Sequence, residues 1–149
     1  MAVKILCDTS VLIPAMMEAH VHHHQTLPLI QEIAAGRLEG AIAAHSLAEC
    51  FSALTTLKDL PPLIPSEARD LIQKNVRPIF QIIPPTIEDY RKAMDLVIRA
   101  PLRGVAVYDA LILQAAIRKK ITRVITWDTK DFSRLSPSGI RIETPDLSC

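Results

Sequence analysis

The first seventeen residues contain the feature that most restricts the fold of this chain. The apolar and β-branched side chains of residues 3–7, interrupted only by Lys4, predict a buried strand. Asp8-Thr9-Ser10 follows, and residues of these types favour helix N-caps over strand interiors. The apolar residues 11–17 then predict a short helix. A strand that passes directly into a helix is the repeating unit of a parallel α/β sheet.

The same alternation continues along the chain. Further strands are predicted at residues 40–44, 77–83, 122–126 and 140–143, with helices between them. Ser46 stands where it could cap the helix that follows residue 44, and Thr86 with Asp89 resembles a capping box at another helix start. We therefore expect a parallel sheet with helices on both faces, formed by residues 1–149 as one domain.

Composition agrees with a single globular domain. A chain of 149 residues with 49% hydrophobic content can bury a sizeable core. No apolar run approaches the roughly 20 residues that span a bilayer, and a strand that starts at Val3 leaves no room for a signal peptide. We therefore expect a cytoplasmic protein with no membrane association. Cys7, Cys50 and Cys149 are expected to be reduced thiols, the first two in the core.

Four acidic residues occupy comparable places in this pattern. Asp8 and Asp128 are expected to end neighbouring central strands, and Glu49 and Asp109 to lie in the first turns of helices. A parallel sheet presents such residues together at its carboxyl edge, where the strand order reverses. Each acid has a structural alternative, because Asp8 and Asp109 could accept helix N–H groups and Glu49 could be solvent-exposed. The order of all four nevertheless favours an acidic metal site.

The chemistry of these residues indicates which metals would suit the site. Carboxylates and water select Mg²⁺ or Mn²⁺ over softer ions, and such cations neutralise a phosphodiester and activate water. The sequence contains no Gly-rich phosphate loop, nucleophile elbow or Cys/His set at metal spacing. His22, His23 and His24 point about 100° apart on a helix, so they predict an exposed helix start rather than one metal site.

Charge gives only local reasons to expect nucleic acid. The formal net charge is +1, whereas a phosphate-binding domain usually has a basic excess. Basic residues gather at 91–92, 99–103 and 118–123, and their default interpretation is a solvated helix face or helix end. Aromatic residues make up 4% of the chain, so we expect any RNA to be bound through backbone charge. Trp127 is interpreted as a packing residue rather than a base-stacking platform.

Four segments together resemble the PIN-domain ribonucleases, especially the VapC-type toxins of toxin–antitoxin systems. They are Cys7-Asp8-Thr9-Ser10, Ala48-Glu49, Tyr108-Asp109-Ala110 and Thr126-Trp127-Asp128-Thr129-Lys130-Asp131-Phe132. The resemblance implies a three-layer α/β/α sandwich with a parallel five-stranded sheet, metal-dependent cleavage of RNA, and a dimer held by a small antitoxin.

Carried over by position, the resemblance also implies roles for individual residues. The acidic quartet that would hold Mg²⁺ or Mn²⁺ is matched by Asp8, Glu49, Asp109 and Asp128. Ser10 and Thr126 match the supporting hydroxyls. Asp131 competes for the fourth acidic position, and we choose Asp128 because it lies nearer the strand end and Asp131 is better placed to cap the turn that holds Phe132.

The expected function is therefore an endoribonuclease that hydrolyses RNA phosphodiester bonds, acting as the toxin of a type II toxin–antitoxin pair. One alternative is a catalytically silent RNA-binding module of the same fold. Another is an aspartyl phosphotransferase with Asp8 as nucleophile, although such enzymes resemble Asp-x-Asp and the third position here is Ser10. A homodimer is also expected, because residues 11–17 and 47–57 offer more apolar surface than a small monomer covers.

Overall fold

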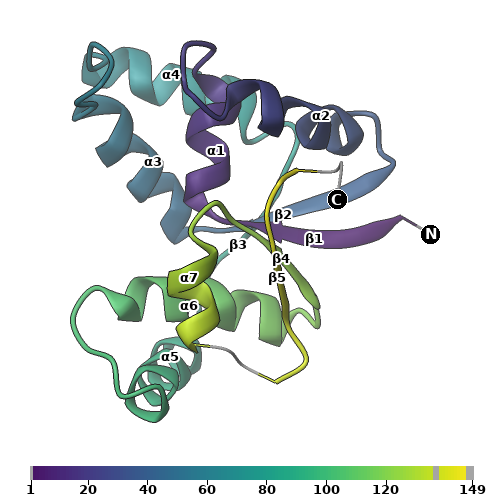
Figure 1. The fold of residues 1–149 in the computed structure, drawn as a ribbon, viewed down its shortest axis with the longest axis vertical. Helices are drawn as coiled ribbons and strands as arrows, with labels where there is room; N and C mark the ends of the chain where they lie inside the picture. The colour runs from purple at the N-terminus through teal and green to yellow at the C-terminus, as the bar shows by residue number, and fades with distance from the viewer. Residues whose placement is uncertain (1, 136–137, 147–149) are drawn as a thin grey trace.

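The centre of the protein is one parallel sheet of five strands (Figure 1). The structure is a computed structural model and describes residues 2–135 and 138–146. The strands are β1 (Val3–Cys7), β2 (Leu38–Ala43), β3 (Gln81–Ile83), β4 (Arg123–Ile125) and β5 (Arg141–Glu143). Their order across the sheet is β3-β2-β1-β4-β5, and every neighbouring pair runs parallel.

Helices cover both faces of this sheet (Figure 1). One layer holds α1 (Thr9–Met16), α2 (His23–Ala34), α3 (His45–Thr55) and α4 (Pro65–Asn75). The other holds α5 (Ile87–Arg99), α6 (Ala106–Arg118) and α7 (Thr129–Leu135). Each layer packs its own apolar core against the sheet. The predicted three-layer α/β/α sandwich is confirmed, and no helix in the described residues is long and apolar enough to cross a bilayer.

The strand order reverses between β1 and β4. The chain builds outward from β1 through β2 to β3, and then returns to place β4 on the other side of β1. Cys7 pairs with Ile125, so the two strands end side by side. The residues that follow them therefore meet at the carboxyl edge, as expected for Asp8 and Asp128. Cys7 and Cys50 are buried as predicted, whereas Cys149 lies outside the described residues.

Two local predictions were wrong. The strand expected over residues 77–83 is confined to Gln81–Ile83, and residues 77–80 form turns and a bend after α4. Ser46 does not cap α3, because the N-cap position is Ala44 and Ser46 is buried inside the helix. The backbone N–H of Ala44 is still bonded to Ile83 in the sheet. The helix therefore begins directly at the strand end, without an intervening capping residue.

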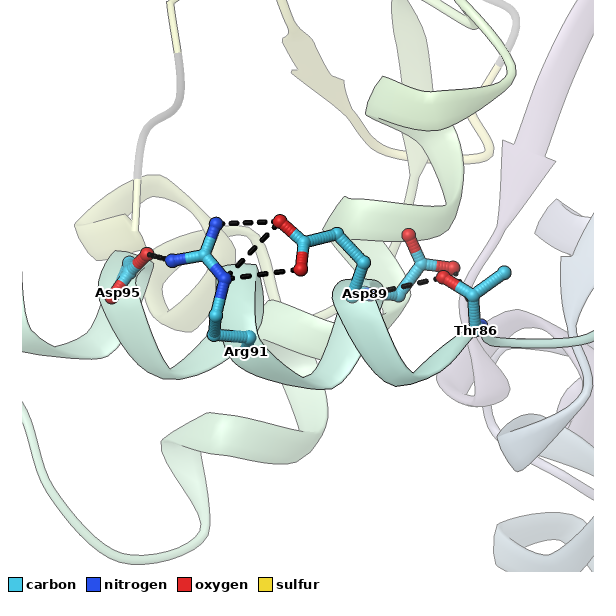
Figure 2. Close-up of polar contacts among 5 residues, drawn as sticks. Thr86, Asp89, Arg91 and Asp95 are labelled. Carbon is cyan, nitrogen blue, oxygen red and sulfur yellow. Dashed lines mark hydrogen bonds and ion pairs between the residues drawn. The ribbon is translucent and has the colours of Figure 1, made fainter.

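Three apolar side chains of α5 face outward, whereas Val97 packs against the core of this layer. Ile87, Met94 and Ile98 are 89%, 52% and 73% exposed, while Ala93 and Leu96 are buried. A polar anchor sets this rotation: the buried Asp89 carboxylate accepts the backbone N–H of Thr86 at 2.9 Å and Arg118 Nε at 2.8 Å. The Thr86 hydroxyl in turn accepts the N–H of Asp89, which completes the predicted capping box (Figure 2).

This anchor should contribute measurably to stability. Asp89→Ala should lower the free energy of unfolding by about 2–3 kcal/mol, because it removes a helix cap and leaves Arg118 without its partner. Urea denaturation followed by circular dichroism measures the change. Asp95→Ala is the matched control, since Asp95 pairs with Arg91 on the exposed side of the same helix and exposed pairs contribute about 0–1 kcal/mol. Equal effects of the two variants would contradict the anchoring role.

Candidate active site

Asp8 is held by both of the strands that meet at the reversal point. Its backbone N–H donates to the carbonyl of Ile125 on β4 at 2.9 Å. Its carboxylate Oδ2 accepts the N–H of Ser10 at 3.3 Å, which makes Asp8 the N-cap of α1, and the hydroxyl of Thr126 at 2.9 Å. Asp8 is only 3% exposed. The capping role considered for it is therefore real, and it coexists with a place at the carboxyl edge.

A chain of hydroxyls supports this carboxylate. An ionised carboxylate can only accept, so Thr126 donates its proton to Asp8, and Ser10, 3.1 Å from Thr126, donates to Thr126 in turn. Ser10 accepts the N–H of Trp127 at 2.9 Å, and Thr126 accepts the N–H of Asp128 at 2.9 Å. The two hydroxyls predicted as supporting residues thus contact Asp8 and connect it to the turn that carries Asp128.

Glu49 reaches the same region from α3. Its Oε1 accepts the hydroxyl of Thr9 at 2.9 Å, and that hydroxyl lies 3.0 Å from Ser46 Oγ. The prediction that Glu49 lies in a first helical turn was wrong, because α3 already begins at His45. Thr9 and Ser46 were missed as supporting residues. The sequence could have indicated Thr9, because it stands between Asp8 and Ser10. It could not have indicated Ser46, whose buried position depends on the packing of α1 against α3.

Electrostatic effects show that the acids surround one region. Asp109 lies in the first turn of α6, and burial together with the charges of nearby carboxylates raises its pKa to about 7. The contributing carboxylates, in order of effect, are Asp8, Glu49, Asp131 and Asp128. Burial, followed by the charges of Asp8 and Asp131, also raises the pKa of Asp128. Burial raises the pKa of Asp8, although the hydrogen bonds that it accepts oppose this.

Cationic partners do not balance these charges. Within the described residues, none of Asp8, Glu49, Asp109 and Asp128 forms an ion pair, and Asp131 lies 4.0 Å from Arg134. In the same part of the chain, no three acidic, histidine or cysteine side chains converge closely enough, as they stand, to hold an ion. The acids therefore form an open cluster of oxygen donors rather than a closed cage of ligands.

The donor set fits a hard divalent cation. All of its members are carboxylates, and Mg²⁺ and Mn²⁺ prefer such oxygen ligands. The nearby thiols offer no alternative: burial, followed by the charges of Glu49 and Asp8, raises the pKa of Cys50 to about 12. Burial also raises the pKa of Cys7. Both side chains therefore stay protonated at neutral pH and are poor nucleophiles or ligands.

Trp127 is a packing residue in this structure, as interpreted from sequence. Its Nε1 donates to Thr26 Oγ1 at 3.0 Å, and the ring of His22 stacks on it with centroids 4.1 Å apart. His23 Nδ1 lies 2.7 Å from the carbonyl oxygen of Pro14. The expectation that the histidine tract is an exposed helix start therefore holds for His24, while His22 and His23 are partly buried.

The raised pKa of Asp109 predicts a pH-dependent stability for the metal-free protein. Its pKa is 3.8 ordinarily and about 7 in the folded chain, so folding favours the neutral acid. The associated stability is present below pH 3.8 and is lost as the pH rises to about 7. Asp109→Asn, neutral at every pH, should therefore gain a few degrees in melting temperature over the parent as the pH rises through this window.

Thermal unfolding in EDTA at a series of pH values measures this difference. Asp70→Asn is the control, because Asp70 is an exposed acid on α4 outside the cluster. The difference in melting temperature between Asp70→Asn and the parent should stay nearly constant with pH. If the melting-temperature difference for Asp109→Asn also fails to grow, burial and like-charge repulsion do not raise the pKa of Asp109 in the folded protein.

Comparisons with known proteins agree with the topology. No curated protein matches the chain. VapC20 of Mycobacterium tuberculosis, described as a sarcin-ricin loop cleaving toxin, superposes with a TM-score of 0.71 at 18% identity, covering 92% of this chain and 98% of that one. A chain of the Rickettsia felis VapBC2 complex with promoter DNA superposes with a TM-score of 0.66 at 17% identity, covering 95% of this chain and 98% of that one. A chain of a Klebsiella pneumoniae toxin–antitoxin complex superposes with a TM-score of 0.64 at 20% identity, covering 95% of this chain and 97% of that one.

These identities establish a shared fold. The sequence itself also matches a family: the PIN domain family matches residues 5–136, which include most of β1, all of β2 to β4 and every acid of the cluster. With that match over most of the chain and the fold of VapC-type toxin structures, the protein belongs to the PIN domain family.

Proposed function

We propose that this protein is a metal-dependent endoribonuclease that hydrolyses RNA phosphodiester bonds, and that it acts as the toxin of a type II toxin–antitoxin pair. One observation carries the proposal: carboxylates from separate elements gather at the carboxyl edge, where burial and the charges of its acidic neighbours raise the pKa of Asp109 to about 7. Membership of the PIN domain family supports the nuclease, and the toxins among the structures of similar fold support the toxin role.

The four acids have complementary positions for this reaction. Asp8, Glu49, Asp109 and Asp128 would hold Mg²⁺ or Mn²⁺, which when bound neutralises phosphate charge and activates water. Thr126 and Ser10 orient Asp8, and Thr9 orients Glu49, through the hydrogen bonds described above. We propose Asp128 as the fourth acid because Thr126 ties its backbone to Asp8. Asp131, which is exposed, is assigned a supporting role.

Two other functions make different predictions in the same assays. A silent RNA-binding relative would bind RNA without hydrolysing it, whatever metal is added. An aspartyl phosphotransferase would form a trappable phosphoryl group on Asp8. That reaction is disfavoured by the structure, because Asp8 is only 3% exposed and its Oδ2 already accepts hydrogen bonds from Thr126 and Ser10.

The direct test is cleavage of single-stranded RNA by the purified protein. Cleavage should require Mg²⁺ or Mn²⁺, stop in excess EDTA and resume when the metal is restored, because uncompensated carboxylates repel an RNA phosphate. Mg²⁺ should also raise the melting temperature, since a ligand that binds only the folded state stabilises it. RNA cleavage that persists in EDTA would remove the metal mechanism.

Asp8→Asn identifies the residue responsible in the same assay. Asn keeps the shape and caps helices about as well as Asp, so the fold without metal should be no less stable. Turnover should fall on the order of 100-fold or more, because even residues that only support a metal ligand typically contribute 10–100-fold. Asp70→Asn, which removes an exposed charge from α4, should retain turnover. Retained activity in Asp8→Asn would refute the metal role, and a large loss of stability would make Asp8 structural.

We also propose an antitoxin partner, a cytoplasmic location and a homodimer. Two regions were expected to supply the dimer surface, and one of them, residues 47–57, keeps Phe51 39% exposed. The other region, residues 11–17, does not supply such a surface. Residues Val11 to Pro14 of α1 are buried, so α1 cannot supply the exposed apolar surface predicted for it. The outward stripe of α5 offers such a surface instead, through Ile87, Met94 and Ile98. A contiguous exposed apolar stripe of this kind favours a second protein chain.

Light scattering at micromolar concentration tests the homodimer. The parent should have twice the chain mass, and Ile98→Glu should shift it towards the monomer, because a charge would enter an apolar interface. Val21→Glu is the control, since Val21 is 82% exposed and lies outside α5. A monomeric parent, or equal dissociation by both variants, would contradict a dimer formed through α5.

A further inference from the structure

A groove with several cationic side chains lies between α5, α6 and α7. Its volume is about 610 Å³, and its charged lining residues are Arg91, Lys92, Arg99, Arg134 and Asp95. Four of these are cations and one is an acid. Such a concentration of positive charge is unexpected in a chain whose formal net charge is +1. The groove is therefore a local exception to the overall charge balance.

Two of the four groove cations have acidic partners within the fold. Arg134 lies 4.0 Å from Asp131. Arg91 is compensated, because its guanidinium contacts Glu88 at 2.6 Å and Asp95 at 2.8 Å (Figure 2). Lys92 and Arg99, on the same helix, form no ion pair with any residue that the structure describes. These two side chains are consequently free to bind an anion.

A buried amide points to a ligand in the same groove. Gln114 is 4% exposed and stands among the apolar buried residues of α6, yet it lines this cavity. Its side chain makes no hydrogen bond to another described residue. No fully buried side-chain oxygen or nitrogen in the described chain lacks a partner, so the Gln114 amide must open onto the groove. An amide in this position can donate and accept one or more hydrogen bonds to a ligand.

The groove adjoins the acidic cluster. Arg134 of α7 lines both the groove and a smaller cavity of about 190 Å³, which is also lined by Asp109, Asp131 and Arg103. A polyanion that places one phosphate at the carboxylates needs cations for the phosphates beside it, because the acidic cluster itself repels them. Arg134 lies between the acidic cluster and the basic groove. The three together provide such a path for the RNA backbone.

We propose that single-stranded RNA beside the scissile phosphate lies in this groove, with Lys92 and Arg99 on its phosphates and Gln114 hydrogen-bonded to a nucleotide. The inference rests on the proposed function, because it assigns a binding path to the substrate of that site. It also gives a role to the one amide among the buried apolar residues of α6.

Binding without cleavage tests the groove directly. The probe is a fluorescein-labelled 12-nucleotide RNA, titrated in EDTA at several salt concentrations and followed by anisotropy. Lys92→Ala/Arg99→Ala should weaken binding about tenfold and reduce the slope of log affinity against log salt by about 1.4, or about 0.7 for each lost phosphate contact. The matched control is Arg69→Ala/Lys74→Ala, which removes two cations from α4 on the opposite layer of the sheet.

The control should bind as the parent does. Equal weakening by both pairs would show a general effect of net charge and overturn the proposal. Unchanged binding in the groove pair would also overturn it and leave the groove to an acidic protein segment.

A second variant separates binding from folding. Gln114→Leu suits an apolar helix, so the free energy of unfolding should not fall, while RNA affinity should decrease severalfold. Lower stability with unchanged affinity would make Gln114 structural and remove it from the proposal. Because no cleavage is needed, groove-dependent binding by a protein that hydrolyses no RNA would refute the nuclease alone. Cleavage by the parent with unaltered binding in the groove variants would refute the groove alone.

Discussion

The hydrogen bonds between Asp8 and the end of β4 are the contact on which the rest of the site depends. Asp8 donates its N–H to Ile125 and accepts the hydroxyl of Thr126, so two strands far apart in sequence end at one level. The same hydroxyl accepts the N–H of Asp128. A shift of β4 by one residue would exchange the faces of its side chains and separate these groups. The geometry of the site is therefore a consequence of strand register.

The site places a destabilising arrangement where the fold can tolerate it. The carboxylates of Asp8, Glu49 and Asp109 form no ion pair with any residue that the structure describes. Burial, together with the charges of the other acids, raises the pKa of Asp109 to about 7. Elsewhere the chain treats a buried acid differently: Asp89 is paired with Arg118 and capped by Thr86, and these contacts outweigh burial and lower its pKa. Asp89 and Asp109 therefore differ in their surroundings: Asp89 has a cationic partner and a lowered pKa, whereas Asp109 has acidic neighbours and a raised pKa.

Opposite charges are divided between neighbouring surfaces. The acids occupy the carboxyl edge, while Lys92, Arg99 and Arg134 line the groove beside it. A formal net charge of +1 therefore conceals an uneven distribution of charge over the surface. Sequence reasoning noted Lys92 and Arg99, with a solvated helix face as their default interpretation, and did not single out Arg134, because the groove is formed only when three helices meet.

Local sequence determined most of the architecture. Strand-to-helix transitions after Cys7, the capping box at Thr86 and the apolar α6 were all visible, because each depends on neighbours within a few residues. The choice of Asp8, Glu49, Asp109 and Asp128 as candidates also came from sequence, through their order along the chain. Tertiary structure then placed these acids, together with Asp131, around one region.

Other properties were decided only by tertiary packing. Ser46 was expected to cap a helix and instead lies buried beside Thr9, because α1 packs against α3. The stripe of Ile87, Met94 and Ile98 has the spacing of a core face, yet it faces solvent because Asp89 and Arg118 set the rotation of α5. The sequence by itself therefore determined which elements form and which residues could act. Only the folded chain decided which side chains meet, because contacts between residues 29 to 118 positions apart depend on sheet order and helix rotation rather than on local preference.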